Sequence, residues 1–162
     1  MWGFRAAFVL LIAAAVASTP ARADETAHIE GGARAIDGDS LVVDGIEVRL
    51  HGVDAPEWDQ VCTRGGQDWT PGRVASAWMA KAVAGRVLAC TVHDVDRYGR
   101  QVATCTADGD AVSLNAQLTR AGLARAYRRY SDDFIEEETA ARTAGRGVWA
   151  GECAAPWDWR RR

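Results

Sequence analysis

The sequence lacks closely spaced metal ligands. Its four cysteines include no Cys-x-x-Cys pair, and they lie at Cys62, Cys90, Cys105 and Cys153. The three histidines are equally scattered, at His28, His51 and His93. Zinc sites usually draw on cysteines and histidines that are only a few residues apart. The spacing therefore argues against a zinc protein.

The chain also has only one long apolar run. This run covers residues 6–17, follows a positive charge at Arg5 and precedes the small-residue sequence Ala21-Arg22-Ala23. It is short for a bilayer span, and the pattern is typical of a secretory signal peptide. We expect residues 1–23 to be cleaved, and an uncleaved anchor is the alternative. Residues 24–162 then form one domain, which we expect to be an exported monomer, periplasmic or secreted, without membrane contact.

The sequence also lacks an excess of basic residues over acidic ones. Without Arg5 and Arg22, the mature chain has 17 Lys and Arg against 22 Asp and Glu, a net charge of −5. Long-range attraction of a polyanion is therefore weak, although local basic groups can still hold phosphates. Such groups occur at Arg97 and Arg100, in residues 120–129 and at the terminal residues 160–162.

The most informative stretch runs from Asp37 to Glu57. Two alternating apolar segments are separated there by only Asp44-Gly45, which is a strong indication of a two-residue β-hairpin. Counting outward from the turn pairs Val43 with Ile46, Val42 with Glu47, Leu41 with Val48 and Ser40 with Arg49. One face of this hairpin is apolar, formed by Leu41, Val43, Ile46, Val48 and Leu50.

Charged side chains meet at one end of this hairpin. Arg49 lies on the polar face beside Asp39, while Asp54 and Glu57 follow on a short segment that Pro56 keeps non-helical. The plain alternative is that the acidic residues cap a turn and that Arg49 is a solvated or salt-bridged strand residue. An EF-hand is excluded, because Leu41 and Val42 occupy positions that need an oxygen ligand and a glycine.

A second hairpin is expected from Val87–Asp94 and Gln101–Thr106. If Asp94 faces Gln101, then Val92 faces Ala103 and Cys90 faces Cys105, so the two cysteines can form a cross-strand disulfide. Cysteines of exported proteins tend to pair. Cys62 with Cys153 is then left by elimination, although the sequence alone does not fix this connectivity.

The other segments predict three helices and one long loop. We expect a surface loop from Trp58 to Gly72 and helices at 73–84, at 114–121 after a Ser113 cap, and at 132–144 with an acidic solvated face and a Glu138–Arg142 pair. Trp157 and Trp159 are expected to dock on the domain ahead of a frayed basic tail, and stacking on bases is the alternative. The order of elements predicts an α+β fold, a small OB-fold β-barrel with about three helices.

Several motifs in order resemble the staphylococcal nuclease (thermonuclease) family. They are Asp37-Gly38-Asp39-Ser40, Val48-Arg49-Leu50, Val53-Asp54-Ala55-Pro56-Glu57, Asp96-Arg97-Tyr98-Gly99-Arg100 and Gly122-Leu123-Ala124. Together they span most of the mature chain. The lysine-rich loop that follows the catalytic glutamate in the family's best-known member is replaced here by residues 58–69.

This resemblance implies a function and a set of site residues. It implies an OB-fold enzyme that hydrolyses DNA or RNA phosphodiesters with Ca²⁺ and leaves 3′-phosphate ends. Asp39, Asp54 and the backbone carbonyl of Ala55 match the calcium ligands. Arg49, Glu57 and Arg100 match the catalytic residues, with Glu57 as the general base. Tyr98 and Tyr127 match the tyrosines around the nucleotide.

Two alternatives remain open beside this interpretation. In one, the same acids hold a structural cation in a non-catalytic OB-fold module that binds nucleic acid. In the other, His51 is the base of a histidine-dependent nuclease, because alternation places it on the same face as Arg49.

Overall fold

A closed five-stranded barrel forms the body of the protein. The computed structural model describes residues 27–162, so the expected signal peptide lies outside the described residues. Around the barrel the strand order is β1-β2-β3-β8-β7. The strands are β1 (His28–Ala35), β2 (Ser40–Val43), β3 (Ile46–Leu50), β7 (Val87–Val95) and β8 (Gln101–Ala107). The prediction of a small α+β OB-fold barrel is confirmed.

The first hairpin has the expected register. Each of the four counted pairs, from Val43 with Ile46 to Ser40 with Arg49, is formed between β2 and β3. The apolar face lines the barrel interior, because Leu41, Val43, Val48 and Leu50 are almost completely buried. Ile46 pairs with Val43 on the same face, as predicted, but it is 42% exposed because it lies next to the turn.

The second hairpin follows the expected register only in part. Cys90 pairs with Cys105 and Val92 with Ala103, as predicted. The register then shifts between Val92 and Asp94, so that Asp94 faces Val102 and Val95 faces Gln101. The predicted pairing of Asp94 with Gln101 is therefore wrong, because an irregularity in β7 adds one residue before the turn.

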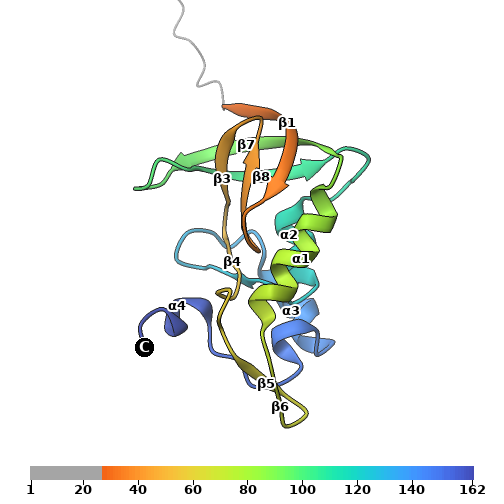
Figure 1. The fold of residues 1–162 in the computed structure, drawn as a ribbon, viewed down its shortest axis with the longest axis vertical. Helices are drawn as coiled ribbons and strands as arrows, with labels where there is room; N and C mark the ends of the chain where they lie inside the picture. The colour runs from red at the N-terminus through yellow and green to blue at the C-terminus, as the bar shows by residue number, and fades with distance from the viewer. Residues whose placement is uncertain (1–26) are drawn as a thin grey trace, which may run out of the picture.

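Within residues 27–162 the structure has four α-helices. They are α1 (Pro71–Val83), α2 (Leu114–Arg120), α3 (Ile135–Thr143) and the short α4 (Pro156–Trp159). Figure 1 shows α1 and α2 running down from the barrel, α3 below them, and α4 with the C-terminus at the lower left, below the barrel. Ser113 caps α2 as predicted, with its hydroxyl accepting from the Ala116 amide. No helix of the described part is long and apolar enough to cross a bilayer.

The acidic helix differs from its prediction. α3 begins at Ile135 rather than near Asp132, and its face is not simply solvated, because Glu138 is buried. Glu138 accepts hydrogen bonds from the Ala126 amide (3.1 Å) and from the Arg128 guanidinium (2.8 Å). Arg128 therefore takes the place expected for Arg142, and Glu138 joins α3 to the chain before it.

The segment expected to be a long irregular loop contains a small hairpin. Strands β5 (Cys62–Arg64) and β6 (Gln67–Trp69) pair around the Gly65-Gly66 turn. Two more short strands, β4 (Val53–Asp54) and β9 (Arg125–Ala126), pair beside the barrel. Strand β4 thus leads the chain directly from the barrel into the acidic segment.

Both expected disulfides are present, Cys90–Cys105 and Cys62–Cys153. The first joins β7 to β8 inside the barrel wall. The second joins β5 to the segment before α4, over a sequence separation of 91 residues. It holds the C-terminal segment against the part of the chain that follows Glu57.

Candidate active site

The turn before β2 fixes the position of Asp39. The Asp37 carboxylate accepts hydrogen bonds from the amides of Asp39 (3.0 Å) and Ser40 (2.8 Å), so the chain turns sharply into the strand. Gly38 packs against Ala55 and Ala75, where an added Cβ would come within 2.9 Å of the nearest methyl groups. The turn therefore presses closely on the segment that carries Asp54.

Asp39 is buried and held on both carboxylate oxygens. Oδ2 accepts a 2.6 Å hydrogen bond from the Ala55 amide, and Oδ1 lies 2.7 Å from the Arg49 guanidinium. Burial raises the pKa of Asp39 to about 7, although the positive charge of Arg49 opposes that rise. The carboxylate is thus oriented by one backbone and one side-chain donor.

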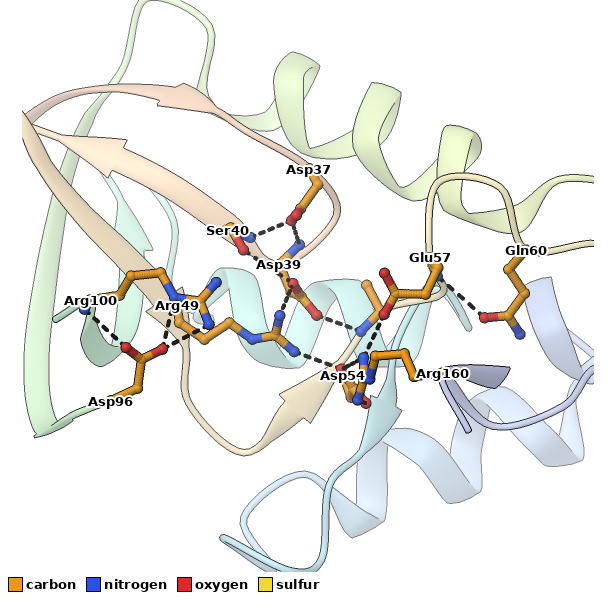
Figure 2. A network of polar contacts seen from close by, with 11 residues as sticks. Asp37, Asp39, Ser40, Arg49, Asp54, Glu57, Gln60, Asp96, Arg100 and Arg160 are labelled. Atoms are coloured by element: carbon orange, nitrogen blue, oxygen red, sulfur yellow. Dashed lines mark hydrogen bonds and ion pairs between the residues drawn. The ribbon is translucent and has the colours of Figure 1, made fainter. Parts of the chain in front are cut away.

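Arg49 joins the two buried aspartates, as Figure 2 shows. One terminal nitrogen, Nη1, contacts Asp39, and the other, Nη2, lies 2.6 Å from Asp54 Oδ1. Burial alone would lower the pKa of Arg49, but the charges of Asp39 and Asp54 outweigh it and raise the pKa. A planar guanidinium has five donors, so Arg49 retains N–H groups for another anion while it holds both carboxylates.

Glu57 is positioned through its backbone. Gln60 is completely buried, and its side-chain oxygen accepts from the backbone amide of Glu57 at 3.2 Å. The backbone amide of Gln60 in turn donates to the Glu57 carbonyl at 3.0 Å. On the other side, Gly72 of α1 packs directly on that carbonyl. The backbone of Glu57 is therefore enclosed between Gln60 and the start of α1.

Gly72 should be sensitive to substitution. A Cβ at this position would lie 1.9 Å from the Glu57 carbonyl oxygen and 2.8 Å from that of Pro56, so backbone has to move. We expect Gly72→Ala to lower the free energy of unfolding by about 1–3 kcal/mol, the usual cost of overpacking. Thermal denaturation followed by circular dichroism measures this. Gly32→Ala is the control, because its Cβ would meet no atom within 4 Å, and equal midpoints for the two variants would contradict the packing.

Arg100 lies apart from the aspartate pair. It binds Asp96 through Nε and Nη2, both at 2.7 Å, and Asp96 also accepts from the amides of Tyr98 and Arg100. Burial alone would raise the pKa of Asp96, but these hydrogen bonds outweigh it and lower the pKa. In Figure 2 the pair occupies the opposite end of the network from Glu57.

The two tyrosines singled out from the sequence have different surroundings. Tyr98 is 69% exposed at the tip of the β7–β8 hairpin, with the guanidinium of Arg97 4.8 Å and that of Arg100 5.5 Å from its ring centre. Tyr127 is partly buried, and Trp157 of α4 stacks on it with the rings 5.0 Å apart and 5° from parallel. One face of Tyr127 is therefore covered by the chain itself.

Sequence reasoning missed Arg160. This residue follows α4 and was expected in a frayed tail, but its guanidinium contacts Asp54 through two nitrogens (2.7 and 3.2 Å) and Glu57 through one (2.5 Å). Hydrogen bonding to Asp54, and less strongly to Glu57, raises its pKa. The only sequence indication was an arginine directly after the two docked tryptophans.

His51 faces a different group of residues. Its ring lies 4.3 Å from that of His93, and its Nε2 is 3.7 Å from Asp133. Burial and the nearby His93 lower the pKa of His51, which favours the neutral imidazole. In the part of the chain that the structure describes, no hydrogen bond or ion pair joins the His51 side chain to Arg49, Asp54 or Glu57.

The oxygen atoms near Arg49 have the chemistry of a hard-cation site. Carboxylate oxygens of Asp39 and Asp54 converge on one guanidinium, and Ala55 with its carbonyl follows directly. Calcium and magnesium prefer such ligands. Within residues 27–162, however, no three His, Cys, Asp or Glu side chains are grouped as a metal site, so any protein cation site here depends on a carbonyl.

Comparison with known proteins gives a consistent result. Residues 47–151 match the family described as Staphylococcal nuclease homologue. An "Uncharacterized endonuclease" of Escherichia coli O157:H7 is 33% identical over 136 residues, which cover 80% of this chain and 82% of that protein. The Succinoglycan biosynthesis protein ExoI of Rhizobium meliloti (strain 1021) is 39% identical over 137 residues, 78% of this chain and 70% of that protein.

A plant relative is longer. Probable staphylococcal-like nuclease CAN1 of Oryza sativa subsp. japonica is 32% identical over 127 residues, which cover 76% of this chain but 35% of that protein. The matched family segment includes Arg49, Asp54, Glu57 and Arg100, whereas Asp39 and Arg160 lie outside it. By the family match and by these relatives, the chain belongs to the staphylococcal nuclease family and is a phosphodiester-hydrolysing nuclease.

Proposed function

We propose that this protein is an exported, calcium-dependent nuclease that cleaves DNA, RNA or both and leaves 3′-phosphate ends. The observation that carries the proposal is the guanidinium of Arg49, which joins the buried Asp39 to Asp54 and has more N–H donors than these two contacts use. Export is supported by the pairing of all four cysteines in disulfides.

Calcium would be held by the carboxylates of Asp39 and Asp54 and by the Ala55 carbonyl. When bound, it supplies Lewis-acid chemistry at a phosphate oxygen. The choice of oxygen ligands agrees with this ion, because a hard cation prefers carboxylates and carbonyls to nitrogen or sulfur. The Ala55 amide and Arg49 fix the Asp39 carboxylate before any ligand arrives.

Glu57 acts as the general base in this proposal. A carboxylate can accept a proton from an attacking water if it reaches that water at hydrogen-bond distance. The backbone of Glu57 is held by Gln60 and by α1, while its side chain is partly exposed toward Asp54 and Arg160. A rigid backbone with an accessible carboxylate suits a base that must meet substrate.

Arg49 and Arg100 neutralise the charge that develops on the phosphodiester. Fixed guanidinium donors are effective in this task because they are oriented before the reaction starts. Asp96 orients Arg100, and Tyr98 beside it offers an exposed ring on which a base can stack. Nucleic acid would then extend from the aspartate pair toward the β7–β8 hairpin tip.

One assay tests the proposal against both alternatives. Purified protein is incubated with single- and double-stranded DNA and with RNA, in calcium or in chelator, together with a His51→Ala variant. We expect calcium-dependent cleavage that is abolished by the chelator and retained in the variant. Loss of cleavage in His51→Ala would favour the histidine-based enzyme. Binding without cleavage would favour the non-catalytic module.

A further inference from the structure

The C-terminal segment, residues 153–162, contacts Asp54, a proposed metal ligand, and Glu57, the proposed general base. Arg160 contacts both oxygens of Asp54, whose side chain is fully buried, and also one oxygen of Glu57 (Figure 2). The Arg160 side chain is itself 40% exposed. One surface guanidinium therefore engages two carboxylates to which the proposed function gives different tasks.

The same segment covers a second part of the site. Trp157, three residues before Arg160, stacks face to face on Tyr127. An aromatic side chain on one face of Tyr127 takes the place that a nucleotide base would take in a stacked complex. Trp157 on Tyr127 and Arg160 on the carboxylates are thus three residues apart, one within α4 and the other directly after it.

The start of the C-terminal segment is fixed to the domain. The disulfide Cys62–Cys153 joins it to β5. The side-chain amide of the buried Gln60 donates to the Ala154 carbonyl at 2.9 Å. Arg125 donates to the Cys153 carbonyl at 2.6 Å. Residues 153–155 are therefore anchored, and α4 with Arg160 extends from this anchor over Asp54.

Two positive charges cannot share these carboxylates without cost. A divalent cation at Asp54 would lie close to Arg160, and like charges at such distances repel each other even in a partly hydrated site. The lone pairs of Asp54 are also shared, because Oδ1 accepts from both Arg49 and Arg160 and Oδ2 accepts from Arg160. The contacts of Arg160 thus oppose metal binding instead of supporting it.

We propose that residues 156–162 form an autoinhibitory plug, in which Arg160 acts as an internal cation on Asp54 and Glu57 while Trp157 covers Tyr127. The plug leaves when a divalent cation and a nucleic acid together take its place. This inference rests on the proposed function, since it assumes that Asp54 binds a cation. Because residues 153–155 stay anchored, the plug is displaced without release of the disulfide-bonded segment.

Calcium affinity is the direct test. Isothermal titration calorimetry with calcium chloride is performed on the wild-type protein, on Arg160→Gln and on Arg161→Gln. Arg161 is the matched control, because it is the neighbouring arginine and, within residues 27–162, forms an ion pair only with Asp158 of α4. We expect Arg160→Gln to bind calcium roughly tenfold more tightly, within the usual range of coupling between sites, and Arg161→Gln to bind like the wild type.

A second variant tests the aromatic half of the plug. Trp157→Ala removes the stack on Tyr127 without altering a charged group. We expect a severalfold lower KM for a short oligonucleotide and an increase in calcium affinity smaller than that of Arg160→Gln. Thermal denaturation of each variant verifies that the fold is intact.

The outcomes separate the inference from the proposed function. Wild-type calcium binding with equal or weaker affinity in Arg160→Gln would overturn the plug and leave the nuclease proposal standing. Absence of calcium binding in both proteins would overturn the metal assignment, and the plug with it. Tighter calcium binding in Arg161→Gln as well would show that the gain in affinity comes from the change in net charge, and it would also overturn the plug.

Discussion

Replacing Glu57 by glutamine is expected to lower kcat by roughly 10²–10⁴-fold, the usual contribution of general acid–base catalysis. Glutamine preserves the size of the side chain and an oxygen that can accept from Arg160, but an amide cannot take a proton from water. The backbone contacts of Glu57 with Gln60 and Gly72 do not involve the carboxylate. The melting temperature should therefore remain close to that of the wild type.

Asp59→Asn is the matched control for this substitution. Asp59 is an exposed acid two residues away, and its conversion removes the same charge from the same segment. Steady-state kinetics on one DNA and one RNA substrate, at saturating calcium, compare the three proteins. Wild-type turnover in Glu57→Gln would show that the base is another group.

Arg49→Lys should lower kcat/KM by about 10²–10³-fold, comparable to the loss of one oriented donor to a transition-state oxyanion. The two terminal nitrogens of Arg49 contact Asp39 and Asp54 separately, at 2.7 and 2.6 Å. A lysine has a single ammonium on a flexible stem and cannot reproduce this planar bridge. One aspartate would lose its partner, and the substrate would lose an oriented donor.

Arg86→Lys controls for the chemical change alone. Arg86 also bridges two aspartates, Asp108 and Asp110, but it does so beside the end of α1, away from the candidate site. We expect its activity to equal that of the wild type. Equal activity of Arg49→Lys and the wild type would remove Arg49 from the catalytic set.

Counting residues outward from the turn predicted the centre of the candidate site because the sequence separations involved are short. A two-residue turn fixes the register of β2 and β3, and this register alone puts Arg49 opposite Ser40 and beside Asp39. The segment with Asp54 and Glu57 follows within a few residues. Cys90 and Cys105 were paired for the same reason, since one hairpin carries both.

Features that depend on distant partners were missed. Strand β1 contains Gly31, Gly32 and several exposed residues, so its pattern does not indicate a strand, and its partners β2 and β7 supply the order. Arg160 meets Glu57 across a sequence separation of 103 residues. No local periodicity encodes such a contact, although the disulfide inferred by elimination already brought the C-terminal segment to this side.

Strand β3 runs parallel to β8, whereas the other four pairings of the barrel are antiparallel. The parallel pairing sets Arg49 beside Val102, so that Arg100, just before β8, starts from the same edge as Arg49. The proposed catalytic arginines thus belong to segments that come together only when the barrel is complete. We therefore expect a chain in which β3 and β8 have not yet paired to be unable to cut nucleic acid.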